Sequence, residues 1–388
     1  MLKAKGIDIG YKNKTVLHDI NIEMNPGQLI CLLGPNGVGK TTFMKCLGGF
    51  LKPQKGEIFI DTHNIHKMTD SQLACKISVV LTGRITASNM TVFDIVSMGR
   101  YPYTGLMGIL SQNDKNIVME SLKSVGIEHL KDRFITETSD GEYQKVMIAK
   151  ALAQQPEVML LDEAVGHLDA KNRFEILLLL RNLAHEKNVT VVMILHEVDL
   201  ALRLCDMVVL VEKGGVKSYG PPEDVLTEKA VKELYNVDKA GFCRSMGTLE
   251  LKCDSNKSLK VHVLSGKGKG APIIRALTRH GYKISVGPLA ENDVDYFVSK
   301  TADTIVYELN DIPALIENLK ESDVIIDVDF SFDGDKLIIL NELKNLNIPI
   351  YSFRNQKEVQ YVYGGHDIKT LNSVEEMLKS LKLQQGIF

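Results

Sequence analysis

The distribution of apolar residues along the chain predicts short buried strands that alternate with amphipathic helices. Continuous apolar runs at Leu29–Leu33, Val158–Leu161 and 189–195 are typical of strands buried on both faces of a parallel sheet. The segment 174–185 has helical spacing and connects the last two runs. This rhythm predicts an α/β fold in which crossover helices cover a parallel sheet.

A second α/β region follows a polar break at residues 254–257. Its pattern predicts one helix, at 273–280. It also predicts five strands, at 259–264, 283–286, 304–307, 324–328 and 349–353. A chain of 388 residues is also too long for one ordinary hydrophobic core. We therefore predict two domains, residues 1–255 and 256–388.

The first apolar run leads directly into a complete phosphate-binding loop. The loop reads Gly34, Pro35, Asn36, Gly37, Val38, Gly39, Lys40, Thr41, Thr42. A strand that feeds a glycine-rich turn into a helix N-terminus presents several N–H groups to one point, with the helix dipole behind them. Lys40 is then expected to reach the β- and γ-phosphates, and the Thr41 hydroxyl to ligate Mg²⁺. A coincidental glycine-rich turn is the alternative, and the flanking strand and helix argue against it.

A polar tetrapeptide, Ser139-Asp140-Gly141-Glu142, precedes the apolar helical segment 146–152. A serine at a helix start with glutamate three residues later is also a capping box, and taken alone we prefer that interpretation.

Acidic and histidine residues follow two of the predicted strands. Asp162 and Glu163 end the strand at Val158–Leu161, at the sheet edge where α/β proteins bind ligands. Asp162 is expected to hold Mg²⁺ through a water, and Glu163 to polarise the attacking water. A solvated acid pair is the alternative. Asp169 lies in a turn after His167, and His196 ends the next strand, where a structural role competes with a contact to the γ-phosphate.

Composition narrows the class of protein without identifying it. The net charge of −3 gives no support for nucleic-acid binding. We see no signal peptide, and the apolar runs are too short to span a membrane. Six scattered cysteines without a CxxC pair indicate reduced thiols and no metal site.

Together, the order and spacing of these motifs resemble the nucleotide-binding subunit of ABC transporters across the whole first domain. By this resemblance, the family's phosphate loop corresponds to Gly34–Thr42 of this chain and its signature motif to 138–142. The Walker B strand with its catalytic glutamate corresponds to 158–163. The D-loop is similar to 167–169, and the switch histidine to His196. The resemblance implies a P-loop NTPase fold with a helical subdomain, and assigns Tyr11 to stacking on adenine.

Three positions depart from the family pattern. Thr82 stands where the family usually has a glutamine that helps to ligate Mg²⁺ and senses the transmembrane partner, so direct metal contact there is doubtful. Thr138 replaces the signature leucine, and Ala164-Val165 replace the usual Pro-Thr. None of these changes removes a group that the phosphate chemistry needs.

The resemblance also implies partners and a location. Two copies would bind ATP head to tail, so that Ser139 and Gly141 of one copy cover ATP on the other. Each pair would drive two membrane permease subunits, supplied by a substrate-binding protein, at the cytoplasmic face of the membrane. The tetrapeptide and the segment 195–202 are similar to the subgroup that imports iron–siderophore complexes, haem and cobalamin. A soluble ABC-type ATPase of translation, DNA repair or cluster assembly is the alternative.

The second domain contains one glycine-rich turn, at Gly266, Gly268 and Gly270, between a predicted strand and a helix. It fits the dinucleotide-binding pattern, but no acid ends the second strand, where a ribose partner is expected. A ligand site and a plain βα turn with solvated lysines are equally supported. Acids at Asp327, Asp329, Asp333 and Asp335 are better explained as a polar loop than as a cation site. The region resembles the Rossmann-like domains attached to some corrinoid or iron-complex transporter ATPases, which leaves a sensor and a dimerisation module open.

Overall fold

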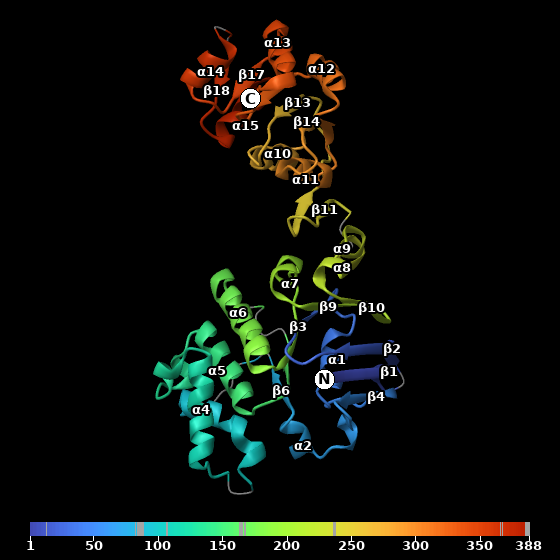
Figure 1. The fold of residues 1–388 in the computed structure, drawn as a ribbon, viewed down its shortest axis with the longest axis vertical. Coiled ribbons are helices and arrows are strands. Elements are labelled where there is room, and N and C mark those ends of the chain that lie inside the picture. Colours follow the sequence, from blue (N-terminus) through green and yellow to red (C-terminus); the bar gives the residue numbers. More distant parts are fainter. Residues whose placement is uncertain are drawn as a thin grey trace. The chain divides into compact units, whose positions relative to one another are not determined.

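The computed structural model describes residues 1–384 except positions 13, 82, 84–88, 106–107, 163–165, 167, 236–237, 365 and 367. Its contacts divide the chain into two compact units, Met1–Thr227 and Glu228–Phe388. Both units combine helices with strands, in agreement with the predicted α/β class (Figure 1).

The first unit is organised around a six-stranded sheet whose centre carries the phosphate loop. In spatial order its strands are β10 (Gly215–Gly220), β9 (Met207–Glu212), β3 (Leu29–Leu33), β8 (Thr190–Ile194), β7 (Val158–Leu161) and β6 (Ile77–Val80). All neighbours are parallel except β10, which pairs antiparallel with β9. Every residue of β3, β7 and β8 is buried, which confirms the parallel sheet predicted from the apolar runs.

A second, antiparallel sheet completes this unit beside helix α1 (Lys40–Leu47). Its strands, in spatial order, are β2 (Lys14–Met24), β1 (Leu2–Tyr11), β4 (Lys55–Ile60) and β5 (His63–Asn64). Ile7 and Ile9 of β1 share a buried cluster with Phe43 and Leu47 of α1. We predicted no strands here, because register shifts between β1 and β2 interrupt the alternation of apolar and polar residues.

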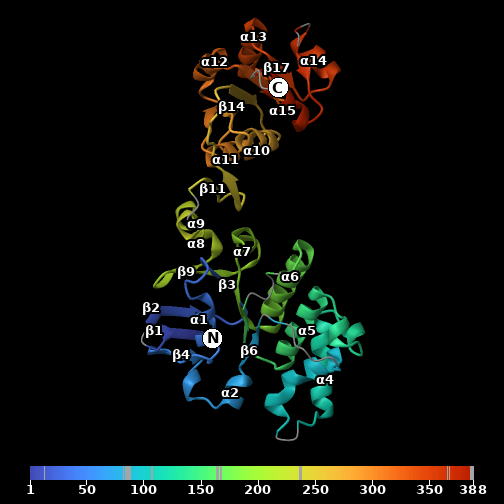
Figure 2. The ribbon, with the colours of Figure 1, turned by 180° about the vertical axis from the view of Figure 1, so that it is seen from behind.

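The other helices of the first unit are α2 (Asp70–Ala74), α3 (Val92–Ser97), α4 (Gln112–Ser124), α5 (Asp140–Ala153), α6 (Ala170–Lys187), α7 (Val198–Leu204) and α8 (Pro222–Val225). Among them, α3, α4 and α5 pack mainly on one another. In both views, α4 and α5 lie on the far side of the unit from β1, β2 and β4 (Figures 1 and 2). Buried Arg100 connects α4 to α5. Its Nε lies 2.9 Å from Asp114 of α4, and its Nη1 donates to the Ala153 carbonyl of α5 at 2.7 Å. Among the described residues, no helix combines the length and hydropathy that crossing a bilayer requires.

The second unit contains a fully parallel six-stranded sheet. Its spatial order is β15 (Ile305–Glu308), β14 (Lys283–Leu289), β13 (Lys260–Leu264), β16 (Val324–Asp327), β17 (Ile350–Ser352) and β18 (Lys369–Thr370). In chain order this is 3-2-1-4-5-6, the arrangement of a Rossmann fold. The predicted Rossmann-like domain is therefore confirmed, and β18 is a sixth strand that we did not predict.

Helices cover both faces of this sheet. One buried cluster joins it to α10 (Ala271–Arg279), α11 (Val294–Thr301) and α15 (Val374–Gln384). A second cluster joins its other face to α12 (Ile312–Lys320), α13 (Leu337–Asn345) and α14 (Gln356–Tyr363). The result is a three-layer sandwich, which explains why the strands read as continuous apolar runs.

The residues before the predicted boundary at 255–256 group with the second unit. They form α9 (Glu228–Tyr235) and the hairpin of β11 (Ala240–Cys243) and β12 (Thr248–Leu251). Glu250 connects the hairpin to α10. Its side chain is only 4% exposed and accepts a hydrogen bond from Arg275 Nε of α10 at 2.8 Å. The compact unit thus begins at Glu228, whereas the polar break used in the sequence lies after the hairpin. The boundary between residues 255 and 256 stays a prediction.

Buried His262, in the centre of β13, anchors a polar network inside the second unit. Its Nε2 lies 3.1 Å from the Gly287 carbonyl, which can only accept, so we assign the ring proton to Nε2. Its Nδ1 then accepts, with Ser285 Oγ at 2.8 Å and Asn318 Nδ2 at 3.1 Å. Burial lowers the pKa of His262 to about 4.

This lowered pKa predicts acid sensitivity of the second unit. The unfolded chain binds a proton near pH 6.5 and the folded chain only near pH 4, so stability is complete above pH 6.5 and falls as the pH drops toward 4. The loss should reach about 3 kcal/mol. Urea unfolding of the full chain between pH 7.5 and 4 measures it. We expect His262→Gln to flatten this dependence and His280→Gln, at a partly exposed site, to preserve it. An unchanged slope in His262→Gln would contradict the assignment.

Candidate nucleotide-binding site

The phosphate loop joins β3 to α1 at the carboxyl end of the parallel sheet. Gly37 and Gly39 have φ of +80° and +115°, a backbone region that favours glycine. Helix α1 begins immediately afterwards at Lys40. Because the first N–H groups of a helix have no acceptor within it, they face the loop and attract an anion.

Lys40 lies over this loop and is only 5% exposed. Its Nζ donates to the Gly34 carbonyl at 2.7 Å and to the Pro35 carbonyl at 2.9 Å. The loop therefore holds the ammonium group beside the start of α1, where it adds a full positive charge to the partial charge of the helix terminus.

Gly34 makes the tightest approach of the loop to the rest of the sheet. A Cβ at this position would lie 2.3 Å from the Val211 carbonyl oxygen of β9, a backbone atom that cannot move cheaply. At Gly37, in contrast, a Cβ would meet no atom within 4 Å. Packing against the backbone thus requires glycine at position 34, whereas at position 37 only the backbone conformation does.

We predict that Gly34→Ala lowers stability more than Gly37→Ala does. Overpacking against a backbone carbonyl should cost up to about 3 kcal/mol, whereas a positive φ alone should cost about 1 kcal/mol. Thermal unfolding of both variants without nucleotide measures the difference. Equal destabilisation would show that the Gly34–Val211 contact relaxes freely.

The oxygen atoms expected to hold Mg²⁺ lie next to the phosphate loop. Thr41 Oγ1 donates to Asp162 Oδ1 at 3.3 Å, and Asp162 follows β7 directly. A hydroxyl and a carboxylate are hard oxygen ligands, and Mg²⁺ takes its remaining ligands from phosphates and water, so the pair fits this ion. No cluster of three His, Cys, Asp or Glu side chains suited to a metal occurs among the described residues. Glu163, the predicted catalytic residue, lies outside the described residues.

The predicted signature residues cap a helix, as their spacing indicated. Ser139 is the N-cap of α5, and its Oγ accepts from the Glu142 N–H at 3.3 Å. In return, Glu142 accepts from the Ser139 N–H at 2.9 Å, and this hydrogen bond lowers the pKa of Glu142. A Cβ on Gly141 would lie 3.0 Å from the Asn172 side chain of α6. The capping box is therefore present, and it places the segment 139–142 at a helix N-terminus beside α6.

The predicted D-loop residue and switch histidine flank α6 and β8. Asp169 caps α6 by accepting from the Asn172 N–H at 2.8 Å; His167 lies outside the described residues. His196 follows Leu195, whose N–H donates to the Leu32 carbonyl of β3 at 3.3 Å. The fold thus brings the segment with His196 to the same sheet edge as the phosphate loop.

Sequence reasoning missed Arg173, which connects these two segments. Its Nη2 donates to the Leu168 carbonyl at 2.9 Å, and its Nη1 pairs with Glu197. In the sequence, Arg173 lies four residues after Asp169, and Glu197 directly follows His196. Nothing in this spacing showed that Arg173 and Glu197 meet.

Tyr11 lies at the end of β1, in a hairpin beside the phosphate loop, and is 50% exposed. The following strand contacts the loop, since a Cβ on Gly39 would lie 2.8 Å from Val16 Cγ1. This position and exposure suit an aromatic ring that stacks on a ligand. Thr82 lies outside the described residues.

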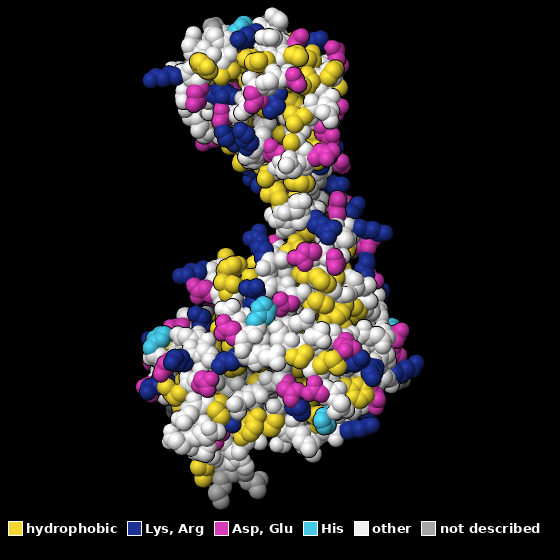
Figure 3. All heavy atoms as spheres, in the orientation of Figure 1, with side chains coloured by type: hydrophobic (Ala, Val, Ile, Leu, Met, Phe, Trp, Pro, Cys, Tyr) yellow, Lys and Arg dark blue, Asp and Glu magenta, His cyan; other side chains and the backbone are white. Residues whose placement is uncertain are grey.

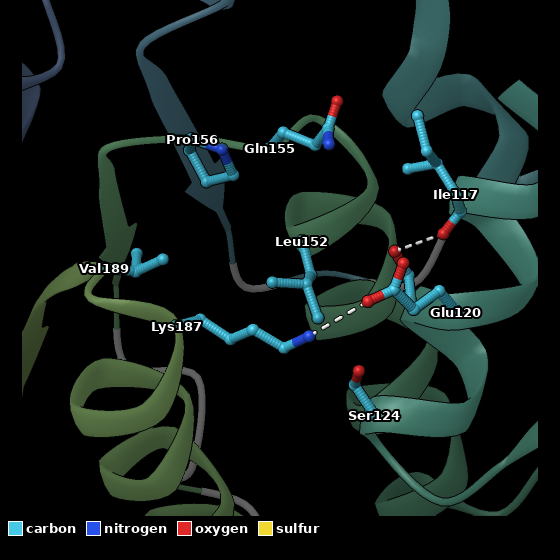
Figure 4. Close-up of a pocket in the computed structure, with 9 residues that line it drawn as sticks. Ile117, Glu120, Ser124, Leu152, Gln155, Pro156, Lys187 and Val189 are labelled. Carbon is cyan, nitrogen blue, oxygen red and sulfur yellow. Dashed lines mark hydrogen bonds and ion pairs between the residues drawn. The ribbon is translucent and has the colours of Figure 1, made fainter. Parts of the chain in front are cut away.

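The first unit also has a cavity of about 230 Å³ among α4, α5, α6 and β8, shown in Figure 4. Lys187 of α6 crosses it to reach Glu120 of α4 at 3.1 Å. None of its described lining residues belongs to the predicted nucleotide site, so the cavity adds nothing to that site.

The glycine-rich turn of the second unit makes contacts that its sequence did not reveal. The N–H groups of Lys267 and Gly268 donate to Asp293, at 2.6 and 3.2 Å, and that of Gly270 donates to Asp295 at 2.9 Å. Strand β14 extends to Leu289 and not to residue 286, which brings Asp293 close to the turn. Asp327 and Asp329 pair with Arg354, and Asp329 also with Lys269.

Comparison with known proteins gives consistent matches. A family model described as ABC transporter matches residues 17–166. An uncharacterized ABC transporter ATP-binding protein of Methanocaldococcus jannaschii is 44% identical over 290 residues, covering 75% of this chain and the whole of that protein. The cobalamin import ATP-binding protein BtuD of Halobacterium salinarum is 30% identical over 301 residues, covering 76% of this chain and 75% of its own length.

A solved structure extends the comparison to an assembly. It is an ATP-binding cassette that forms a dimer in a post-hydrolysis state with ADP and phosphate. It is 27% identical and has a TM-score of 0.50, covering 57% of this chain and 99% of its own.

Proposed function

The chain belongs to the family of ABC transporter ATP-binding proteins, whose cassettes hydrolyse ATP, and we propose that it powers import of an iron complex or cobalamin. The observation that carries this proposal is the convergence of the phosphate loop, Asp162 and the segment with His196 at one edge of the parallel sheet. The resemblance of residues 139–142 and 195–202 to the importer subgroup supports the substrate class, as does the similarity to a cobalamin import protein.

Binding of ATP follows from the loop geometry. The N–H groups at the start of α1 and the Lys40 ammonium hold the phosphates, and exposed Tyr11 stacks on the base. Thr41 and Asp162 would hold Mg²⁺, Thr41 as a direct ligand and Asp162 through a water. When bound, this ion neutralises charge on the transferred phosphoryl group.

Hydrolysis requires a base and a second copy of the chain. Glu163 polarises the attacking water and His196 contacts the γ-phosphate. Ser139 and Gly141, at the N-terminus of α5, complete the site on the partner, where fixed donors stabilise developing charge. Asp169 belongs to the turn that meets the partner copy. The dimeric cassette with ADP and phosphate supports this arrangement.

Closure of this dimer drives two integral membrane permease subunits, to which a substrate-binding protein delivers the cargo. The chain then lies at the cytoplasmic face of the membrane. On the face in Figure 3, basic and acidic side chains are interspersed. Together with the net charge of −3, this gives no support for nucleic acid as a partner.

Fractionation of cells that produce the tagged chain tests the proposal. We expect the chain in the membrane pellet, bound to a permease. Washing the membranes with salt should not release the chain. The control is the same chain in cells without that permease gene, where it should leave the pellet. Recovery with ribosomes or DNA in the soluble fraction would support the alternative of a soluble ABC-type ATPase. Uptake assays with labelled cobalamin and labelled ferric siderophores then identify the cargo.

A further inference from the structure

The second unit has a cavity of about 260 Å³ at the carboxyl ends of its strands. Its walls are the loops that follow β13, β14, β15 and β16. The strand order reverses between β13 and β16, since β14 and β15 lie on one side and β17 and β18 on the other. Open α/β sheets bind ligands in the crevice at this point. The cavity therefore occupies the position where this fold accommodates a ligand.

The glycine-rich turn beside the cavity cannot act as an ordinary dinucleotide site. In such a site the turn and the helix N-terminus offer their N–H groups to a pyrophosphate. Here Asp293 accepts from Lys267 and Gly268, while fully buried Asp295 accepts from Gly270 and, at 2.7 Å, from Ala271. A pyrophosphate would have to displace two carboxylates of the chain itself.

Lysine side chains offer an anion a different place in the same cavity. Lys267, Lys269 and Lys336 all line it. Lys269 is neutralised by Asp329, and Lys336 lies 3.2 Å from exposed Asp333. The Lys267 ammonium makes no direct hydrogen bond or ion pair with any part of the chain that the structure describes, and its charge acts on Asp329 and Asp333 only at longer range, where it lowers the pKa of each. A ligand anion would therefore meet Lys267 first, with Lys336 as a second cation.

Two of the residues that line the cavity have an unusual backbone conformation. Lys267 and Asp329 have φ of +59° and +54°, although neither is glycine. Such residues gather at ligand sites, where the surroundings hold them in place. They lie after β13 and β16, the two strands that flank the crevice, so the outliers and the cavity coincide.

The remaining wall is apolar and sets the size and chemistry of the ligand. Pro288, Leu289, Leu309 and Phe330 form a surface suited to the face of a base or sugar. A cavity of about 260 Å³ is too small for a dinucleotide. We propose that this cleft binds a phosphate monoester of mononucleotide size, with its phosphate on Lys267 and Lys336 and its organic part on the apolar wall. This inference goes beyond the proposed transport function, because none of the residues that carry it belongs to the nucleotide site of the first unit.

A single-tryptophan reporter tests the site in the full chain. The chain has no tryptophan, so Leu309→Trp places the only one in this cleft. The four nucleoside 5′-monophosphates are titrated separately up to millimolar concentrations. We expect at least one to give a saturable change in fluorescence. Adding Lys267→Met should weaken its binding about tenfold. Lys283→Met, at the opposite end of β14, should leave binding unchanged.

Two further ligands decide the assignment. The matching nucleoside without phosphate should bind at least about tenfold more weakly than the monophosphate, and NAD should bind more weakly as well. No saturable change with any monophosphate, equal binding of the nucleoside, or tighter binding of NAD would each overturn the proposal. If Leu309→Trp unfolds the unit, Ser331→Trp, at an exposed position of the same cavity, replaces it as the reporter.

Discussion

Replacing Lys40 with alanine should lower the affinity for ATP by about 10- to 100-fold, because hydrogen bonds from a charged group are worth about 1.5–3 kcal/mol. Lys40 is almost buried, and the Gly34 and Pro35 carbonyls hold its ammonium beside the start of α1. Residues 34–42 contain no other lysine, so no residue of the loop itself replaces the lost charge. Equilibrium binding of a fluorescent ATP analogue measures the effect.

Lys45→Ala is the matched control for this experiment. Lys45 lies in the last turn of the same helix and is exposed, so the variant should bind ATP as the wild type does. Thermal unfolding of Lys40→Ala without nucleotide separates lost binding from lost structure. If a folded Lys40→Ala protein bound ATP at wild-type affinity, Lys40 would have no role in holding the phosphates.

Replacing Glu163 with glutamine should lower kcat for ATP hydrolysis by about 10²- to 10⁴-fold, which is the usual contribution of a general base. Glutamine keeps the size of the side chain but cannot accept the proton of the attacking water. The affinity for ATP should stay within a few-fold of the wild type, because Lys40, Thr41 and the start of α1 are unchanged. Steady-state phosphate release at saturating ATP measures kcat, and equilibrium ATP binding measures the affinity.

The control variant is Glu157→Gln, which makes the same chemical change before the amino end of strand β7. Glu157 pairs with Lys76, away from the carboxyl edge where Asp162 meets Thr41. Its hydrolysis rate should equal that of the wild type. If Glu163→Gln hydrolysed ATP at the wild-type rate, the base would have to be another residue.

The sequence predicted those parts of the fold whose signal is local. Strands β3, β7 and β8 are wholly buried and short, so their apolar runs identify them, with ends that differ by no more than one residue. The phosphate loop and the cap of α5 depend on residues close together in the chain. The antiparallel sheet of β1 and β2 escaped prediction because its register shifts break the alternation.

Contacts between distant segments could not be predicted in the same way. Arg173 meets Glu197 only because helix α6 packs against β8, whose end leads to Glu197. Likewise, the turn at Gly266 matched a dinucleotide pattern, yet two aspartates from the start of α11 occupy its N–H groups. A local motif specifies the donors of a site, and the rest of the fold decides which acceptor reaches them.

The position of β3 in the centre of its sheet has a consequence for synthesis of the protein on the ribosome. Its two parallel neighbours are β8 and β9, and β9 begins only at Met207. At roughly 5–20 residues per second, about 10–35 s separate the synthesis of Leu33 from that of Met207. Both edges of this apolar strand are unpaired until β8 is made, and one edge stays unpaired until β9 follows, which favours aggregation.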